Sequence, residues 1–195
     1  MLFRSKIDNH LTKITKNINN KIWLINRIKS NLDKNTKILL IKNLIISQLN
    51  YCSTFLFQLN KTQINNLTIL IKKAIKTILN IDILFPSIEL FKKFDLLSPS
   101  QLIWRNTMMY IHKANLGLIN DTVLAQQVVP SNIHNYNFRN ATEYFVKTFK
   151  NEHCNSQWFT KGLIQYKNLP EEIINCNISR FKKEINSLAL KIDIR

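Results

Sequence analysis

The chain has 195 residues and a net charge of +16, with 28 Lys and Arg against 12 Asp and Glu, and 45% of its residues are hydrophobic. A chain of this length and hydrophobic content can bury a core in one or two domains. With two Gly and four Pro, it is short of the turn residues that a β-sandwich or β-barrel needs, so a mainly α fold is expected.

The positive charge is concentrated in the first part of the chain. Residues 1–80 hold 14 Lys and Arg against two acids, whereas residues 81–195 hold 14 against 10. Drift toward AT-rich codons would also enrich Asn, Ile and Lys. Glu codons are AT-rich too, however, and residues 1–80 contain no Glu. The asymmetry therefore favours a polyanionic partner, nucleic acid before membrane.

Apolar residues recur at helical spacing over residues 5–32, which predicts a first helix. Another face of this helix carries a row of cations separated by multiples of seven residues: Lys6, Lys13, Arg27 and Lys34. Asn20 interrupts this row, and two further cations, Lys16 and Lys29, widen it. Solvated faces usually mix signs, so this row favours phosphate contact over simple solvation. Trp23, on the basic side, could pack on a sugar or base, but burial against a neighbouring element is expected.

Residues 36–59 form the longest apolar segment without Gly or Pro. Its apolar residues have the helical period and cover nearly the whole circumference, which predicts a buried central helix of a bundle. Asn35 is the expected N-cap. A membrane span is excluded because polar residues interrupt the required run of about 20 apolar residues. These residues are Lys42, Asn43, Gln48 and Asn50.

A third helix is predicted to follow Asn60, which can form a capping box with Gln63. Three lysines lie near the C-terminus of this helix: Lys72, Lys73 and Lys76. They can compensate the helix dipole, contact phosphate, or do both.

Further helices are predicted after Pro86 and over residues 99–114 and 170–191, while VVPSNIHNYNFRN indicates a loop. The expected organisation is a three-helix bundle, a helical extension packed on it, and a smaller, mostly helical and irregular C-terminal region. These parts span residues 1–80, 81–116 and 117–195. The N-terminus lacks an apolar signal core, and three scattered Cys suggest a reducing compartment, so the cytoplasm or nucleus is expected.

Residues that would carry independent catalysis are sparse. There is no Gly-rich phosphate loop, and the four His do not fall at metal-ligand spacing with one another. His153 beside Cys154 is the nearest approach to a cluster. Acids are too scattered for a convincing two-metal site. Neither a cofactor nor a metal is therefore expected for this chain.

The first predicted helix is followed in order by two further segments, LIISQLNYCSTFLF and INNLTILIKKAIKTILN. The order of these three segments resembles the region after the catalytic palm in non-LTR retrotransposon (LINE-type, jockey-like) reverse transcriptases. Three smaller motifs continue the resemblance: Phe94-Asp95-Leu96-Leu97 with Pro99, then Tyr136, Phe138 and Arg139, and finally Leu169-Pro170 with Phe181, Lys182 and Lys183. In the last motif, Tyr166 and Lys167 replace the Trp and Asn that are usual in the family.

The resemblance implies that residues 1–80 are similar to the thumb of an RNA-directed DNA polymerase. The palm, with its Asp-Asp motif for a divalent metal such as magnesium, would lie upstream of Met1. The chain then looks like a fragment that is inactive alone, and no catalytic residue carries over. Its implied partners are an RNA/DNA template–primer duplex and the palm, with no membrane.

The candidate nucleic-acid-binding residues are Lys6, Lys13, Lys16, Arg27, Lys29, Lys72, Lys73 and Lys76. Arg139 is a possible addition. The alternative is a helical protein–protein interaction module that does not bind nucleic acid. A basic amphipathic membrane-surface binder is a third possibility, which a buried central helix disfavours.

Overall fold

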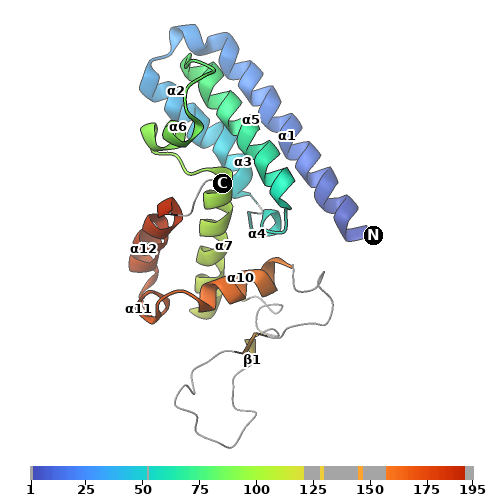
Figure 1. Cartoon of the computed structure of the whole chain (residues 1–195), viewed down its shortest axis with the longest axis vertical. Coiled ribbons are helices and arrows are strands. Elements are labelled where there is room, and N and C mark those ends of the chain that lie inside the picture. The colour runs from blue at the N-terminus through green and yellow to red at the C-terminus, as the bar shows by residue number, and fades with distance from the viewer. Residues whose placement is uncertain (1, 52, 121–127, 130–144, 147–156, 192–195) are drawn as a thin grey trace, which may run out of the picture. The chain divides into compact units, whose positions relative to one another are not determined.

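The computed structural model describes residues 2–51, 53–120, 128–129, 145–146 and 157–191 (Figure 1). In this part of the chain the fold is mainly helical, which confirms the predicted fold class. The chain forms two compact units: unit 1 is Met1–Trp104 with Ala189–Arg195, and unit 2 is Arg105–Leu188. The division falls inside two helices, between Trp104 and Arg105 and between Leu188 and Ala189. The boundaries predicted from the sequence lie near residues 80 and 116.

In unit 1, α1 (Leu2–Ile28) and α5 (Lys61–Leu79) run side by side in the same direction (Figure 1). Near the start of both helices, Gln63 Nε2 donates a hydrogen bond to Asp8 Oδ1 at 2.8 Å. The intervening segment returns in the opposite direction, and Lys21 donates to the carbonyl of Leu44 at 3.0 Å. The three segments therefore pack as a bundle.

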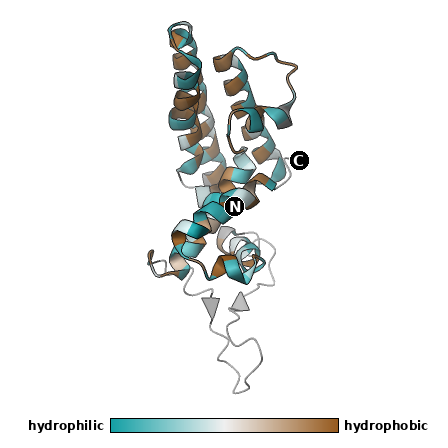
Figure 2. Ribbon diagram, turned by 90° about the vertical axis from the view of Figure 1, so that its left-hand side faces the viewer, coloured by the Kyte–Doolittle hydropathy of each residue, from teal (hydrophilic) through white to brown (hydrophobic). Residues whose placement is uncertain are grey.

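The core of the bundle comes from one apolar stripe of each segment. The helices are amphipathic, with hydrophobic and hydrophilic residues along the same ribbons (Figure 2). Buried side chains recur at the helical period on α1 and α5, as predicted. They include Ile14, Ile18, Ile22 and Ile25 of α1, and Leu67, Ile71, Ile75 and Ile78 of α5. The first helix ends at Ile28, earlier than predicted, and a 3₁₀ turn, η1 (Lys29–Asn31), follows it.

The predicted central helix does not extend to residue 59, because it breaks at Tyr51. Before the break, α2 (Lys34–Leu40), the π-helical η2 (Ile41–Ile46) and α3 (Ser47–Asn50) follow one another directly, with helical backbone at both junctions. The short α4 (Ser53–Leu56) comes after the break. A π-turn closes i→i+5 hydrogen bonds and so brings residues five apart toward one side. Ile41 and Ile46 are accordingly both buried.

The chain leaves the helix at Tyr51, whose backbone is extended. After this break, the neighbouring residues Leu56 and Phe57 are both buried. The N-cap is also not the predicted Asn35. Asp33 Oδ2 accepts hydrogen bonds from the backbone N–H groups of Asn35 and Thr36 at 2.9 and 3.2 Å.

The predicted capping box of α5 is confirmed. Asn60 Oδ1 accepts from the Gln63 backbone N–H at 2.8 Å, and Gln63 Oε1 accepts from the Asn60 N–H at 3.0 Å. The helix ends at Asn80, a left-handed C-cap with φ 52°. Two further predicted helices follow as α6 (Ser87–Lys93) and α7 (Pro99–Asn115).

Unit 2 contains the second half of α7 together with α10 (Trp158–Lys167), α11 (Glu171–Ile174) and most of α12 (Ile178–Lys191). The predicted single helix over residues 170–191 is therefore wrong. It breaks between α11 and α12, where Cys176 is buried and Asn177 Oδ1 accepts from the Arg180 N–H at 2.9 Å. Two short antiparallel strands, β1 (Val128–Val129) and β2 (Phe145–Val146), complete the described part.

Candidate nucleic-acid interface

The outward face of α1 carries three of the predicted cations, and their side chains are exposed: Lys13, Lys16 and Arg27. Because each helical residue turns by about 100°, these three positions fall within an arc of roughly 60°. At about 1.5 Å per residue, they extend over about 21 Å of helix. The buried stripe on the other side holds α1 in the bundle, so the structure brings these cations onto one side of a packed helix. We call this surface the α1 basic face.

The cations of the α1 basic face are not neutralised by neighbouring acids. Lys13 and Lys16 have no hydrogen-bond or ion-pair partner among the described residues. The ion pair that unit 1 does form in this part of the chain joins Lys42 to Asp95, at 3.9 Å. Asp8, the only acid in the α1 sequence, accepts from Gln63 instead. The positive potential of this face is therefore available to an anion.

Trp23 belongs to the α1 basic face, and the expectation that it would be buried is wrong. Its side chain is 60% exposed. The guanidinium carbon of Arg27 lies 4.6 Å from the centroid of its ring, one helical turn further on. This is a cation–π contact, since such contacts extend to about 6 Å. An aromatic surface thus interrupts the cationic row.

Lys29 is separated from this face. It lies sixteen residues after Lys13, and a helix turns by about 160° over that interval. Its ammonium donates to the Thr77 carbonyl and to Asn80 Oδ1, each at 2.8 Å. Thr77 and Asn80 belong to the C-terminal end of α5, where a cation offsets the helix dipole. Lys29 therefore joins the ends of α1 and α5.

The three lysines of α5 have different surroundings. Lys76 donates to the carbonyls of Ile83 and Phe85, the latter at 2.9 Å, and so anchors the loop after α5. Lys72 is half-buried, and its pKa is lowered first by desolvation and second by the charge of Lys76. Lys73 is exposed. Of this cluster, Lys73 and Lys72 have ammonium groups without a hydrogen-bond or ion-pair partner among the described residues.

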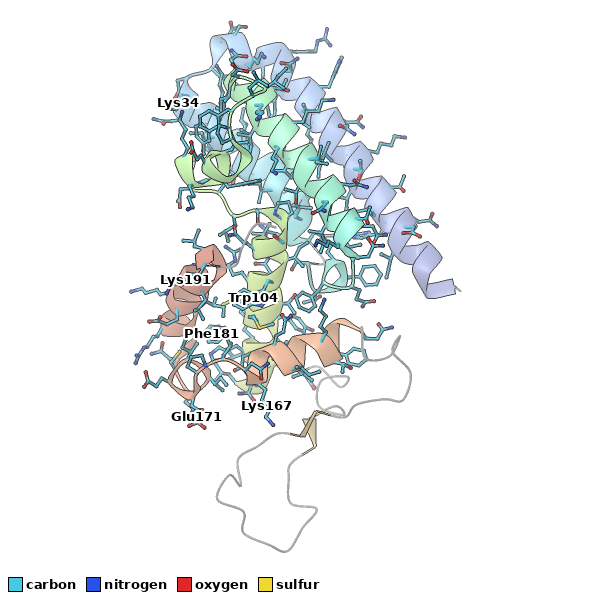
Figure 3. The ribbon with its side chains drawn as sticks, in the orientation of Figure 1. Lys34, Trp104, Lys167, Glu171, Phe181 and Lys191 are labelled. Carbon is cyan, nitrogen blue, oxygen red and sulfur yellow. The ribbon has the colours of Figure 1, made fainter. Side chains whose placement is uncertain are left out.

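Some predicted residues lie outside what the structure describes. The backbone of Lys6 belongs to α1, but its side chain is outside the description, as are Tyr136, Phe138 and Arg139 altogether. Lys34, the last member of the predicted row, begins α2 rather than continuing α1 (Figure 3). Its ammonium lies 5.9 Å from the centroid of the Phe94 ring.

Sequence reasoning missed the loop between α5 and α6, which exposes two large apolar side chains. Ile83 and Leu84 are 84% and 88% exposed. The loop is nevertheless structured, because Asp82 Oδ1 accepts from the Leu84 N–H at 2.9 Å and Lys93 lies 4.7 Å from the Phe85 ring centroid. In the sequence, Asp82 indicated a turn at this place, because Asp side chains often accept hydrogen bonds from the backbone two residues on. The contacts of Lys76 and Lys93 with this loop depend on the fold.

Within the described ranges, no group of three or more His, Cys, Asp or Glu could hold a metal ion. In the same ranges, the helices do not combine the length and apolar character that crossing a membrane demands.

No protein-family model matches the sequence, and no curated protein or solved structure matches it significantly.

Proposed function

We propose that this protein is a nucleic-acid-binding module, similar to the thumb and C-terminal region of a non-LTR retrotransposon reverse transcriptase, that holds a template–primer duplex by its backbone. The observation that carries this proposal is the α1 basic face. Lys13, Lys16 and Arg27 are exposed on one side of a packed helix, and acids do not neutralise them.

The spacing of these cations suits a phosphate backbone. The roughly 21 Å between Lys13 and Arg27 is much longer than the axial rise of about 3.4 Å between phosphates of one strand, so the cations at the two ends of the face can reach different phosphates. Phosphate contacts fix the position of a duplex and carry no sequence information directly. A module that must follow a polymerase along any sequence requires contacts of this kind.

Charge crowding at the end of α5 gives a second reason to expect an anionic partner. Unit 1 contains 18 Lys and Arg against 6 Asp and Glu, a net charge of +12. Within this unit, the pKa of Lys72 is lowered first by desolvation and then by the neighbouring charge of Lys76. A phosphate near Lys72 and Lys73 would reduce the repulsion.

A protein–protein interaction module is the alternative. Its support is the structured loop that presents Ile83 and Leu84 to solvent. A partner that buried these two side chains would remove their apolar surface from water. This binding would depend weakly on salt, because it would not release counterions from a polyanion.

The test is a salt titration of the affinity of the full chain for duplexes. We expect DNA duplexes and RNA/DNA hybrids of unrelated sequence to bind similarly, with log affinity falling linearly against log salt concentration. Each phosphate contact contributes a slope of about 0.9 on B-form DNA. Absence of binding at low salt, or affinity that is indifferent to salt, would contradict the proposal and favour the alternative.

A further inference from the structure

The exposed indole of Trp23 gives the α1 basic face a capability beyond phosphate contact. Arg27 lies over the ring, yet the side chain remains 60% exposed, so much of the aromatic surface is open to a ligand. The cations Lys16 and Arg27 lie on the two sides of Trp23 along the helix, seven and four residues away. The chain therefore presents an aromatic surface between two exposed cations.

A paired base cannot use this surface easily. In a continuous duplex, the faces of the bases are covered by the neighbouring base pairs, and reaching one requires unstacking or flipping. Unpaired bases, by contrast, can stack on an aromatic side chain while cations track the backbone. This stacking tolerates any sequence because every base has a π-face.

We propose that the α1 basic face also binds a single-stranded segment of nucleic acid, with one base stacked on Trp23 and the flanking phosphates near Lys16 and Arg27. The inference depends on the proposed function, since it uses the same face, and it adds the unpaired strand as a ligand. A base on the open part of the indole would leave Arg27 free to contact the adjacent phosphate.

The test compares two single strands of equal length and charge, a short thymidine oligonucleotide and its abasic counterpart. Both present the same phosphates, but only the first offers bases. For the wild-type chain we expect the thymidine strand to bind about 5-fold to 150-fold more tightly, the range that stacking of one base supplies. In Trp23→Leu this preference should disappear, whereas Trp23→Phe should retain part of it.

Tyr51→Leu is the matched control, because Tyr51 is an exposed aromatic residue of unit 1 outside α1. It should keep the full preference for the thymidine strand. Circular dichroism of each variant verifies that the helices are retained, as expected at Trp23 because Leu is a good helix former. If Trp23 had only a structural role, Trp23→Leu would lower the affinity for both strands equally, and the ratio of the two affinities would not change.

Two negative results have different meanings. If the wild-type chain binds both strands equally and with strong salt dependence, base stacking is excluded while backbone binding stands. If neither the strands nor a duplex binds at low salt, the proposed function fails as well. A preference that survives in Trp23→Leu would also overturn the assignment to this residue.

Discussion

Lys29 shows how one side chain can connect two helices of unit 1. Its ammonium donates to the Thr77 carbonyl and to Asn80 Oδ1, across 48 and 51 residues of sequence. Helical periodicity predicted that Lys29 widens the basic row of α1. Its partners are far away in sequence, and local spacing contains no information on them. Its role in the folded chain is therefore to stabilise the end of α5.

We predict that Lys29→Met, which keeps the aliphatic length but removes the charge, lowers the free energy of unfolding by about 1 to 2 kcal/mol through the lost charged hydrogen bonds. Lys13→Met is the control, because Lys13 is exposed without a partner and its replacement should change stability by less than about 0.5 kcal/mol. Urea unfolding followed by circular dichroism measures both. Equal stability of the two variants would contradict the role given to Lys29.

His112 is a buried titratable group of unit 2. Its Nδ1 lies 2.8 Å from the Tyr166 hydroxyl, and its ring stacks on Phe181 with 3.7 Å between centroids (Figure 3 labels Phe181). Desolvation lowers the pKa of His112 below 6.5, and the backbone of Cys176 opposes this only in part.

Because the folded-state pKa lies below the unfolded value, His112 contributes full stability above about pH 6.5. The unfolded chain binds the proton first as the pH falls, so stability declines by at most about 1.4 kcal/mol per pH unit and levels off below the folded pKa. We predict that His112→Phe, which preserves the stack on Phe181, removes this part of the decline. Thermal unfolding between about pH 5 and 8 measures it, and identical pH profiles would refute the prediction.

At the scale of elements, local chemistry was predictable and tertiary packing was not. The capping box of Asn60 and Gln63 depends on residues three apart, so the sequence contained all the information it needs. The π-helical turn and the break at Tyr51 depend instead on which side chains the neighbouring helices can bury. The apolar content of residues 36–59 indicated burial but could not locate the π-helical turn or the break.

One side of the segment of residues 36–59 is buried and the other is exposed, so replacing Leu by Asp should have different effects on the two sides. Leu49 is 1% exposed in α3, whereas Leu39 is 56% exposed in α2. We predict that Leu49→Asp unfolds unit 1, because an unpaired buried carboxylate costs several kcal/mol out of the roughly 5 to 15 kcal/mol of a typical domain. Leu39→Asp should cost less than about 1 kcal/mol, mainly through helix propensity. Far-UV circular dichroism with thermal melting measures both, and a stable, helical Leu49→Asp variant would contradict the core.

At the scale of the whole molecule, charge is distributed unevenly between the units. Unit 1 has a net charge of +12, while unit 2 has 10 Lys and Arg against 6 Asp and Glu, a net charge of +4. The sequence predicted this asymmetry and the shared side of Lys13, Lys16 and Arg27, because both follow from composition and helical period. The exposure of Trp23 and the separate roles of Lys29 and Lys76 required the packing of the bundle.

The most direct test of phosphate binding by the α1 basic face compares two triple variants of equal charge. One replaces Lys13, Lys16 and Arg27 with Gln, and the other replaces the exposed Lys182, Lys183 and Arg180 of α12 with Gln. Each variant loses three positive charges on a helix, and Gln preserves helix propensity.

The measurement is the slope of log duplex affinity against log salt concentration, with circular dichroism as the folding control. We predict that the α1 variant has a slope shallower by about 2.7, from three contacts of about 0.9 each, and that the α12 variant retains the wild-type slope. An unchanged slope in a folded α1 variant, or an equal change in both variants, would contradict the account.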